Sequence, residues 1–264
     1  MHPFLNTAIK AARRAGQLVL RYSSQLERVA IESKGRNDFV TEVDRQVEGE
    51  IISILQGAYP DHAILAEESG SHQGNEFEWI IDPLDGTTNY LHSYPQFSVS
   101  IALRHKDKLT QAVVFDPMRD ELFTASRGEG AQLNDRRIRV SKNSRLENSL
   151  LGTGFPFKDL DKLEIWIDTF RHLIKMTQGI RRAGSAALDL AYVASGRLDG
   201  FWEIGLHPWD MAAGCLLIEE AGGLVCDFSG GQDYLQTGNV VTANSAIHAP
   251  LLDIVQSSLP PDFV

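Results

Sequence analysis

The sequence predicts an α+β protein in which layers of helices pack against layers of strands. Two amphipathic helix patterns precede a series of strand patterns in the first half of the 264 residues, and helix and strand patterns alternate in the second half. Acidic residues follow several predicted strands or begin a predicted helix. Because binding sites form where packed elements meet, we expect a functional site between the layers.

The elements of the first half follow from the spacing of apolar residues. Apolar residues recur at helical spacing over 5–19, with basic residues on the other face, and over 44–58, where acidic residues come first. Five strand patterns follow, which cover residues 63–66, 79–81, 97–103, 112–115 and 121–125. A turn at 116–120 is expected to join the last two into a hairpin. We expect the second of these strands to stop before Pro83, because proline cannot donate the next ladder hydrogen bond.

The second half alternates between strand and helix patterns. The predicted strands cover residues 149–153, 200–203, 224–227 and 239–243. The predicted helices cover residues 163–177, 186–195 and 211–221, and a further helix closes the chain. Gly196 and the pair Gly222-Gly223 follow two of these helices, where glycine commonly ends a helix. No repeat, low-complexity tract or linker marks a domain boundary.

Composition and charge narrow the class of protein. A hydrophobic content of 43% with 23% charged residues is ordinary for a globular protein, and no uncharged apolar run approaches the roughly 20 residues that span a bilayer. The N-terminus lacks the pattern of a secretory signal, and Cys215 and Cys226 are expected to be reduced core residues, which favours the cytoplasm. A net charge of -10 disfavours sequence-independent binding to nucleic acid.

The clearest chemical signal is the string Asp82-Pro83-Leu84-Asp85-Gly86-Thr87-Thr88-Asn89, which follows an apolar run. Its two carboxylates lie on one short segment and could converge on a hard cation. The glycine and threonines that follow can begin a helix whose free amides bind an anion. Carboxylates for a cation beside amides for an anion are what metal-assisted phosphate chemistry requires.

Two other acidic residues extend this signal. Glu67 follows a predicted strand, and Asp210 begins a predicted helix. Each alone is explained as a solvated strand end or a helix N-cap, but neither explanation covers the whole set. Mg²⁺ takes about six oxygen ligands, which suits carboxylates gathered from separate loops. Glu68 is expected to point away from Glu67, because neighbours on an extended chain face opposite sides.

These motifs resemble those of the inositol monophosphatase family of magnesium-dependent, lithium-sensitive phosphatases. The string at 82–89 is similar to the first family signature, and Trp209-Asp210-Met211-Ala212-Ala213-Gly214 to the second. The resemblance covers nearly the whole chain and is closest to the bacterial, SuhB-type branch. It implies a layered α-β-α-β-α sandwich of two closely joined subdomains, which we place at residues 1–148 and 149–264.

The resemblance also implies a role for each site residue. The metal ligands for Mg²⁺ would be Glu67, Asp82, the carbonyl of Leu84, Asp85 and Asp210. A metal-bound water would attack phosphorus in line, with Thr87 orienting the water, Asp44 supporting Thr87 and Glu67 accepting the proton. The substrate contacts would come from Gly86, Thr87, Ser185, Ala186, Glu203 and Asp210. Lys34 matches a family lysine or is a surface charge, and Trp209 is expected to pack beside Asp210.

Other phosphatases give alternative interpretations. The haloacid-dehalogenase type carries a similar string, but its second aspartate comes two residues after the first, whereas the spacing here is three, so we reject it. A sister activity on fructose 1,6-bisphosphate, 3′-phosphoadenosine phosphate or histidinol phosphate would share the metal residues. No basic residue is prominent near Glu203 in the sequence, which favours a monophosphate such as inositol 1-phosphate.

A different class of role also stays open. The bacterial branch is associated with antitermination of ribosomal RNA transcription, which implies Nus factors or RNA polymerase as partners of a protein-binding regulator. Arg181 and Arg182 could contact such a partner, although a solvated pair of arginines is the simpler explanation. The resemblance further implies a homodimer.

Overall fold

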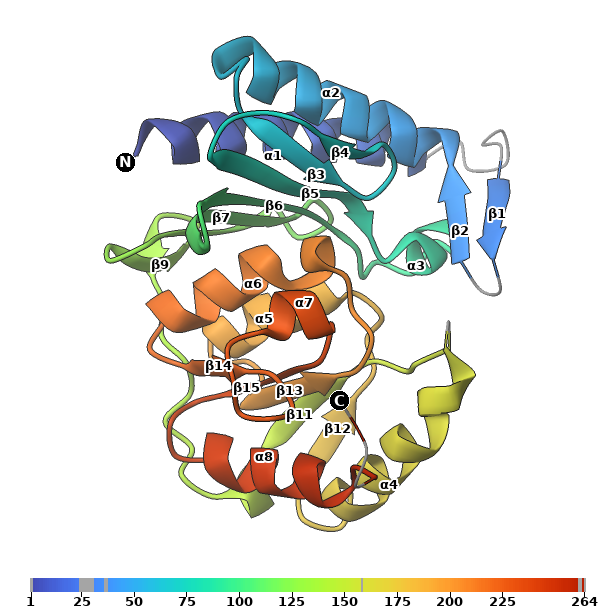
Figure 1. The fold of residues 1–264 in the computed structure, drawn as a ribbon, viewed down its shortest axis with the longest axis vertical. Coiled ribbons are helices and arrows are strands. Elements are labelled where there is room, and N and C mark those ends of the chain that lie inside the picture. The colour runs from blue at the N-terminus through green and yellow to red at the C-terminus, as the bar shows by residue number, and fades with distance from the viewer. Residues whose placement is uncertain (1, 24–30, 36–37, 158, 261–262, 264) are drawn as a thin grey trace.

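The computed structural model describes residues 2–23, 31–35, 38–157, 159–260 and 263, and for residues 31–35 and 38–41 it describes the backbone alone. Its helices and strands form five layers, which run helix, sheet, helix, sheet, helix from top to bottom of Figure 1. The predicted fold class, a layered α-β-α-β-α sandwich, is therefore confirmed.

The upper two layers are formed by the first part of the chain. The top layer consists of α1 (Pro3–Ser23) and α2 (Glu42–Ala58). The sheet below them contains β3 (Ala63–Ala66), β4 (Gly70–His72), β5 (Phe77–Asp85), β6 (Ser98–His105), β7 (Lys108–Asp116), β8 (Glu121–Ser126), β9 (Gly130–Leu133) and β10 (Arg136–Arg137). The strand order is β10-β9-β8-β7-β6-β5-β3-β4, and β3 and β5 run parallel. A separate hairpin of β1 (Ile31–Gly35) and β2 (Asp38–Thr41) and the short helix α3 (Thr87–Leu91) lie at one end of this sheet.

The lower three layers are formed by the rest of the chain. The middle layer contains α5 (Ala186–Ala194), α6 (Pro208–Glu220) and α7 (Tyr234–Thr237). The second sheet contains β11 (Leu150–Thr153), β12 (Gly179–Arg181), β13 (Gly200–Glu203), β14 (Leu224–Cys226) and β15 (Val240–Ala243), in the order β12-β11-β13-β15-β14. The bottom layer contains α4 (Leu163–Leu173) and α8 (His248–Ser257). Two 3-10 helices, at Leu146–Asn148 and Leu160–Lys162, directly precede β11 and α4 in the chain.

Three hydrophobic clusters fill the spaces between these layers. The upper cluster joins α1 and α2 to the eight-stranded sheet, and the lower cluster joins the second sheet to α4 and α8. The middle cluster is built on α5 and α6, which are buried on nearly all sides. A helix that is apolar all round is typical of a protein interior, so these two helices form a core shared by both sheets.

The subdomain boundary after residue 148 stays a prediction. The chain passes from the first sheet to the second between Arg137 and Leu150. The middle helices pack on both sheets, however, and an ion pair joins Arg197 after α5 to Glu121 on β8 through two contacts of 2.6 Å. The two halves therefore pack directly against each other, and their description as one catalytic unit also stays a prediction.

The structure corrects several predicted boundaries. The strand at 79–81 does not stop before Pro83, because β5 continues to Asp85 through a bulge that takes up the proline. The helix predicted from residue 163 to 177 ends at Leu173, and the helix predicted from residue 211 begins at Pro208, whose fixed φ suits a first helical turn. The short strands β4, β9, β10 and β12 were not predicted, because they carry too few apolar residues to give a pattern.

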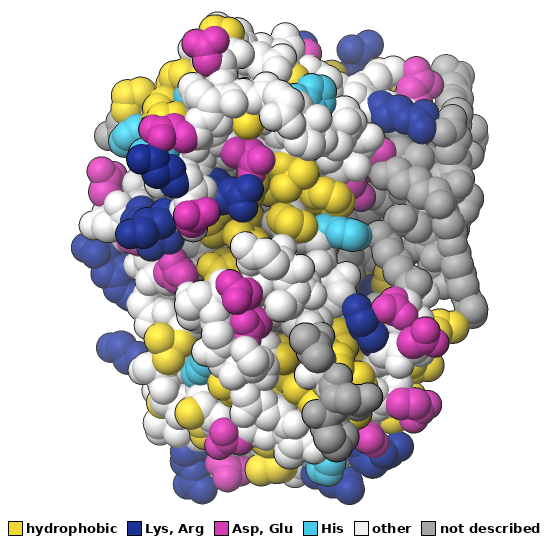
Figure 2. All heavy atoms as spheres, in the orientation of Figure 1, with side chains coloured by type: hydrophobic (Ala, Val, Ile, Leu, Met, Phe, Trp, Pro, Cys, Tyr) yellow, Lys and Arg dark blue, Asp and Glu magenta, His cyan; other side chains and the backbone are white. Residues whose placement is uncertain are grey.

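Three further observations on the described residues concern helix polarity, surface charge and the two cysteines. No helix in the described ranges is long and apolar enough to cross a bilayer. Acidic and basic side chains are intermixed over the face in Figure 2. Cys215 and Cys226 are both buried and free, as predicted.

Candidate active site

A cavity of about 440 Å³ lies where α3 and the ends of both sheets meet α5 and α6. Every predicted site residue except Asp44 lines it. These are Glu67, Asp82, Leu84, Asp85, Gly86, Thr87, Ser185, Ala186, Glu203 and Asp210. The structure therefore brings together residues that are up to 143 positions apart in the sequence, from Glu67 to Asp210.

Three aspartates form the centre of the cavity. Carboxylate oxygens of Asp82, Asp85 and Asp210 all lie within 4.8 Å of one another. Asp82 comes from β5, Asp85 from the end of the same strand, and Asp210 from the first turn of α6. Oxygen donors at this spacing fit a hard cation such as Mg²⁺, for which carboxylates are the preferred protein ligands.

The electrostatics of the centre also fit a cation. Burial raises the pKa of Asp82 well above its ordinary value, and the carboxylates of Glu67, Asp85 and Asp210 raise it further. Burial and the neighbouring Asp210 raise the pKa of Asp85 to about 7, against the effect of its hydrogen bonds. Such repulsion between like charges is what a bound divalent ion relieves.

The bulge in β5 explains how two carboxylates of one strand converge. Asp82 pairs with Ser100 and Asp85 with Ser98, so β5 advances three residues while β6 advances two. The extra residue turns the second carboxylate toward the same side as the first. The Asp82 carboxylate also accepts a hydrogen bond of 2.9 Å from the Leu84 amide, which fixes the bulge. Pro83 is tolerated there because a bulge leaves one residue without a ladder partner.

Thr87 and Asp44 contact each other, as the resemblance implies. The Thr87 hydroxyl lies 3.2 Å from a carboxylate oxygen of Asp44 and 3.1 Å from the carbonyl oxygen of Leu84. Asp44 is fully buried on α2 and contacts Thr87, but it is not among the residues that line the cavity. It is therefore placed to act on Thr87 and not directly on a ligand.

The two adjacent glutamates have different surroundings. Glu67 lines the cavity, while the amides of Glu68 and Ser69 each donate a hydrogen bond of 2.8 Å to the carboxylate of Glu48. Glu48 is buried on α2, one turn after Asp44. Sequence reasoning missed it, although an acidic residue on the apolar face of a predicted helix was the available signal.

Ser185 and Ala186 lie at the start of α5. The Ser185 hydroxyl donates a hydrogen bond of 2.6 Å to Asp85, and the amide of Ala187 donates one of 2.8 Å to the same carboxylate oxygen. Ser185 is also the N-cap residue of the helix. The roles of Ser185 and Ala186 toward the substrate stay predictions, while the structure gives Ser185 a direct contact with Asp85.

The far wall of the cavity carries Glu203 at the end of β13. Burial and the nearby Asp210 raise its pKa well above the ordinary value, and Arg182 acts in the opposite direction. The Arg182 guanidinium lies over the rings of Phe155 and Phe157, with its carbon 4.9 Å and 5.2 Å from their centroids. The expectation that no basic residue lies near Glu203 was therefore wrong. Arg182 directly follows β12, and Glu203 ends β13. Both strands pair with β11, so the sheet brings these two residues to the same cavity although they are distant in sequence.

Asp189 is a further residue that sequence reasoning missed. It lines the cavity from α5, is buried, and has a pKa raised by burial and by the Asp85 carboxylate. Its only sequence signal is one acidic residue within the otherwise apolar helix Ala186–Ala194.

The sequence also predicted Trp209 and Lys34 at the edge of the site. Trp209 stacks on the ring of His207, with centroids 4.7 Å apart, and packs against the middle cluster. This contact places it beside Asp210, where a packing role was predicted. The side chain of Lys34 lies outside the described residues.

The sequence is similar to that of a known protein family and of named bacterial proteins. The sequence profile of the inositol monophosphatase family matches residues 1–259. The Nus factor SuhB of Pseudomonas aeruginosa is 53% identical over 99% of this chain and 98% of its own length. The Nus factor SuhB of Escherichia coli is 50% identical over 98% of each chain.

Solved structures agree in fold as well as sequence. The extragenic suppressor protein suhB of Bartonella henselae is 43% identical with a TM-score of 0.93, over 96% of this chain and 98% of that one. An inositol monophosphatase from Anabaena is 42% identical with a TM-score of 0.86, over 98% and 97% of the two chains. The chain therefore belongs to the inositol monophosphatase family of phosphatases.

Proposed function

We propose that the protein is a Mg²⁺-dependent phosphomonoesterase that hydrolyses inositol 1-phosphate and related polyol monophosphates. The observation that carries the proposal is the convergence of Asp82, Asp85 and Asp210 beside Thr87 in one cavity. The cavity is large enough for a phosphorylated six-carbon polyol.

The metal would be held by the carboxylates of the centre together with one backbone oxygen. Its ligands would be Glu67, Asp82, the carbonyl of Leu84, Asp85 and Asp210. When bound, Mg²⁺ supplies a more acidic water and offsets the negative charge of the phosphate.

Thr87 is suited to orient the attacking water. Its hydroxyl carries one proton, and the two acceptors at hand, Asp44 and the Leu84 carbonyl, both lie within hydrogen-bond distance. The hydroxyl oxygen is then left to accept a hydrogen bond from the water, which fixes the direction of attack. Glu67 is the carboxylate proposed to take the proton that the water releases.

The remaining residues would bind the substrate itself. The amides of Gly86 and Thr87 are proposed to contact the phosphate oxygens. Glu203, with Ser185, Ala186 and Asp210, is proposed to select the alcohol, since a carboxylate accepts hydrogen bonds from the hydroxyls of a polyol.

The experiment that tests this function is a phosphate-release assay with purified protein. Inositol 1-phosphate, glycerol 2-phosphate, fructose 1,6-bisphosphate, 3′-phosphoadenosine phosphate and histidinol phosphate would be compared with and without Mg²⁺. We expect the highest kcat/KM for inositol 1-phosphate and no turnover after chelation. A clear preference for a bisphosphate would instead favour a sister activity, to which Arg182 could contribute.

We propose a second role as a Nus factor, because the relatives from Pseudomonas aeruginosa and Escherichia coli carry that name at 53% and 50% identity. The partners would be other Nus factors or RNA polymerase, which would place the protein in the cytoplasm. The exposed Arg181 at the end of β12 is the residue to test, since Arg182 also lines the cavity. An Arg181→Ala variant that keeps phosphatase activity but loses binding to RNA polymerase would separate the two roles.

We also propose that the protein forms a homodimer, in line with the family resemblance. Multi-angle light scattering of the purified chain tests this directly. A mass near the 29.3 kDa of one chain would contradict it.

A further inference from the structure

The side-chain amide of Asn89 joins two segments that belong to different layers. Its nitrogen lies 2.7 Å from the carbonyl oxygen of Gln96, 2.9 Å from that of Ala183 and 3.2 Å from that of Gly184. Gln96 lies just before β6 in the upper sheet, whereas Ala183 and Gly184 lie between β12 and α5. We propose that Asn89 is a positioning residue that aligns the two halves of the active site.

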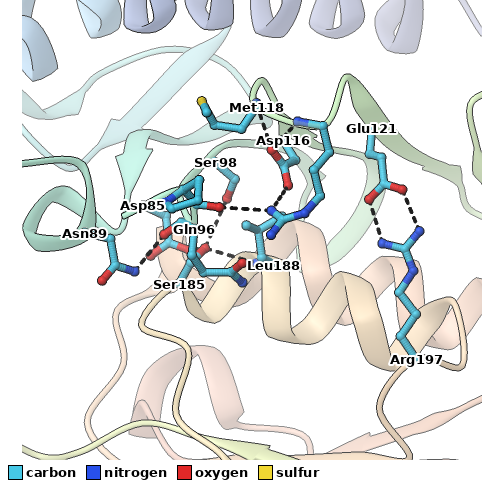
Figure 3. Close-up of polar contacts among 12 residues, drawn as sticks. Asp85, Asn89, Gln96, Ser98, Asp116, Met118, Glu121, Ser185, Leu188 and Arg197 are labelled. Carbon is cyan, nitrogen blue, oxygen red and sulfur yellow. Dashed lines mark hydrogen bonds and ion pairs between the residues drawn. The ribbon is translucent and has the colours of Figure 1, made fainter. Parts of the chain in front are cut away.

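The link from Asn89 to the metal centre runs through the start of α5. Gly184 is followed directly by Ser185, whose hydroxyl lies 2.6 Å from Asp85. The amide of Ala187 lies 2.8 Å from the same carboxylate oxygen. Figure 3 shows Asn89 pointing toward Gln96, with Asp85 and Ser185 beside them. By holding the two carbonyl groups before Ser185, Asn89 fixes where these donors meet Asp85.

The packing around this link leaves little freedom for another arrangement. A Cβ on Gly86 would lie 2.9 Å from the Gln96 carbonyl oxygen and 3.2 Å from that of Gly184. A Cβ on Gly184 would lie 3.0 Å from the Asn89 amide nitrogen. Both glycines also have positive φ values, of 93° and 90°. The segments approach each other closely here, and the Asn89 amide supplies the donor that three carbonyl oxygens share.

The consequence rests on the proposed metal-dependent function. A group that orients a metal ligand typically changes metal affinity or activity by about 10–100-fold when it is removed. We expect Asn89→Ala to weaken Mn²⁺ binding, measured by electron paramagnetic resonance of the free ion, by about tenfold. We expect kcat for inositol 1-phosphate to fall by a similar factor with little change in KM. Asn89→Asp, which keeps the shape but places a charge against three carbonyl oxygens, is expected to lose more.

Asn244→Ala is the matched control. Asn244 is buried, and its amide nitrogen lies 2.9 Å from the Ser141 hydroxyl and 3.0 Å from the Asn143 carbonyl oxygen, away from the cavity. Asn244→Ala removes a buried side-chain amide with hydrogen bonds similar to those of Asn89, so we expect a lower melting temperature. Mn²⁺ affinity and kcat should stay within twofold of the wild type. Equal effects of the two substitutions on Mn²⁺ affinity would show that Asn89 is merely structural and overturn the proposal.

A double-mutant cycle tests the route through Ser185. If Asn89 acts by placing Ser185 on Asp85, the losses in Mn²⁺ affinity for Asn89→Ala and Ser185→Ala combine to less than their product. Fully multiplicative losses would contradict this route. A wild-type protein that releases no phosphate from any ester, yet shows the difference in Mn²⁺ affinity, would refute the proposed function and leave the positioning role intact. An active wild type whose Asn89→Ala variant has unchanged Mn²⁺ affinity and kcat would refute the positioning role and leave the proposed function intact.

Discussion

At the scale of single residues, the centre of the site combines groups that repel one another when no cation is bound. Burial raises the pKa of Asp82, and three neighbouring carboxylates raise it further. A site that requires this repulsion for function lowers the stability of the metal-free protein. Function and stability should therefore respond in opposite directions to the loss of one charge.

Asp82→Asn tests this opposition. The amide removes one negative charge while its oxygen can still accept the hydrogen bond from Leu84. We expect activity at saturating Mg²⁺ to fall about a thousandfold or more, and the melting temperature in EDTA to rise by a few degrees. Phosphate release and differential scanning fluorimetry measure the two effects. A variant with near-normal activity would remove Asp82 from the proposed ligands.

Thr87→Ala separates water orientation from phosphate binding. The backbone amide proposed to hold phosphate remains, whereas the hydroxyl between Asp44 and Leu84 is lost. We expect kcat to fall about 100-fold or more with KM nearly unchanged, because the lost interaction acts chiefly in the transition state. Thr87→Ser, which keeps the hydroxyl, should recover much of the rate. A raised KM at constant kcat would instead make Thr87 a ground-state phosphate contact.

Glu203→Gln tests the division between alcohol and metal contacts. Losing one charge-assisted hydrogen bond is worth roughly 1.5–3 kcal/mol, so the preference for inositol 1-phosphate over glycerol 2-phosphate should drop about tenfold or more. Inhibition by Li⁺, expected from the family resemblance to act at a metal position, should stay unchanged. Comparison of kcat/KM for both substrates, with and without Li⁺, gives the answer. An altered response to Li⁺ would place Glu203 in the metal site.

At the scale of elements, the helices and strands that have a regular spacing of apolar residues were predicted from the sequence. Features that depend on pairing or on polar contacts between distant elements were not. The long helices α1 and α2 and the apolar strands β5 to β8 appeared in the predicted order. The continuation of β5 through its bulge depends on pairing with β6, which no local pattern contains. The carboxylates of the candidate site were predicted from their positions after strands and at a helix start, and the other site residues from the family resemblance. Glu48, Asp189 and the placement of Arg182 became visible only when distant elements were brought together.

Glu48→Ala tests how α2 supports the segment that carries Glu67. The buried carboxylate accepts hydrogen bonds of 2.8 Å from the amides of Glu68 and Ser69. Removing it leaves two donors without their partner, so we expect the free energy of unfolding to fall by about 2–3 kcal/mol in urea denaturation. Glu50→Ala, which removes a half-buried carboxylate of the same helix that pairs with Arg14 at 2.9 Å, should change it by less than about 1 kcal/mol. Equal effects would mean that the two amides find other acceptors.

At the scale of the whole molecule, stability should depend on pH through a histidine far from the site. His248 at the start of α8 is buried, with its ring nitrogen 3.4 Å from the sulfur of Cys226. Burial lowers its pKa below the ordinary 6.5, against the effect of a hydrogen bond with the Val241 backbone. The unfolded chain therefore binds the proton more readily than the folded one, and this contribution to stability is lost as pH falls below about 6.5.

His248→Gln provides the test. Urea midpoints of the wild type and the variant would be compared at pH 7.5 and pH 5.5, each with the same Mg²⁺ concentration. We expect the wild type to lose more stability on acidification than the variant, because the carboxylates of the site contribute equally to both. A parallel loss in the two proteins would show that His248 accepts its proton without cost in the folded state.

The middle helix layer also has a consequence for the protein during its synthesis. The lower face of the first sheet contributes Ile80, Ala102, Val114 and Phe123 to the core built on α5 and α6. A ribosome completes that sheet well before it translates α6, and at about 5–20 residues per second the interval lasts several seconds. During this interval the nascent chain presents an uncovered apolar surface. A chaperone near the ribosome exit, or rapid translation of residues 186–220, would protect this surface from aggregation in the growing chain.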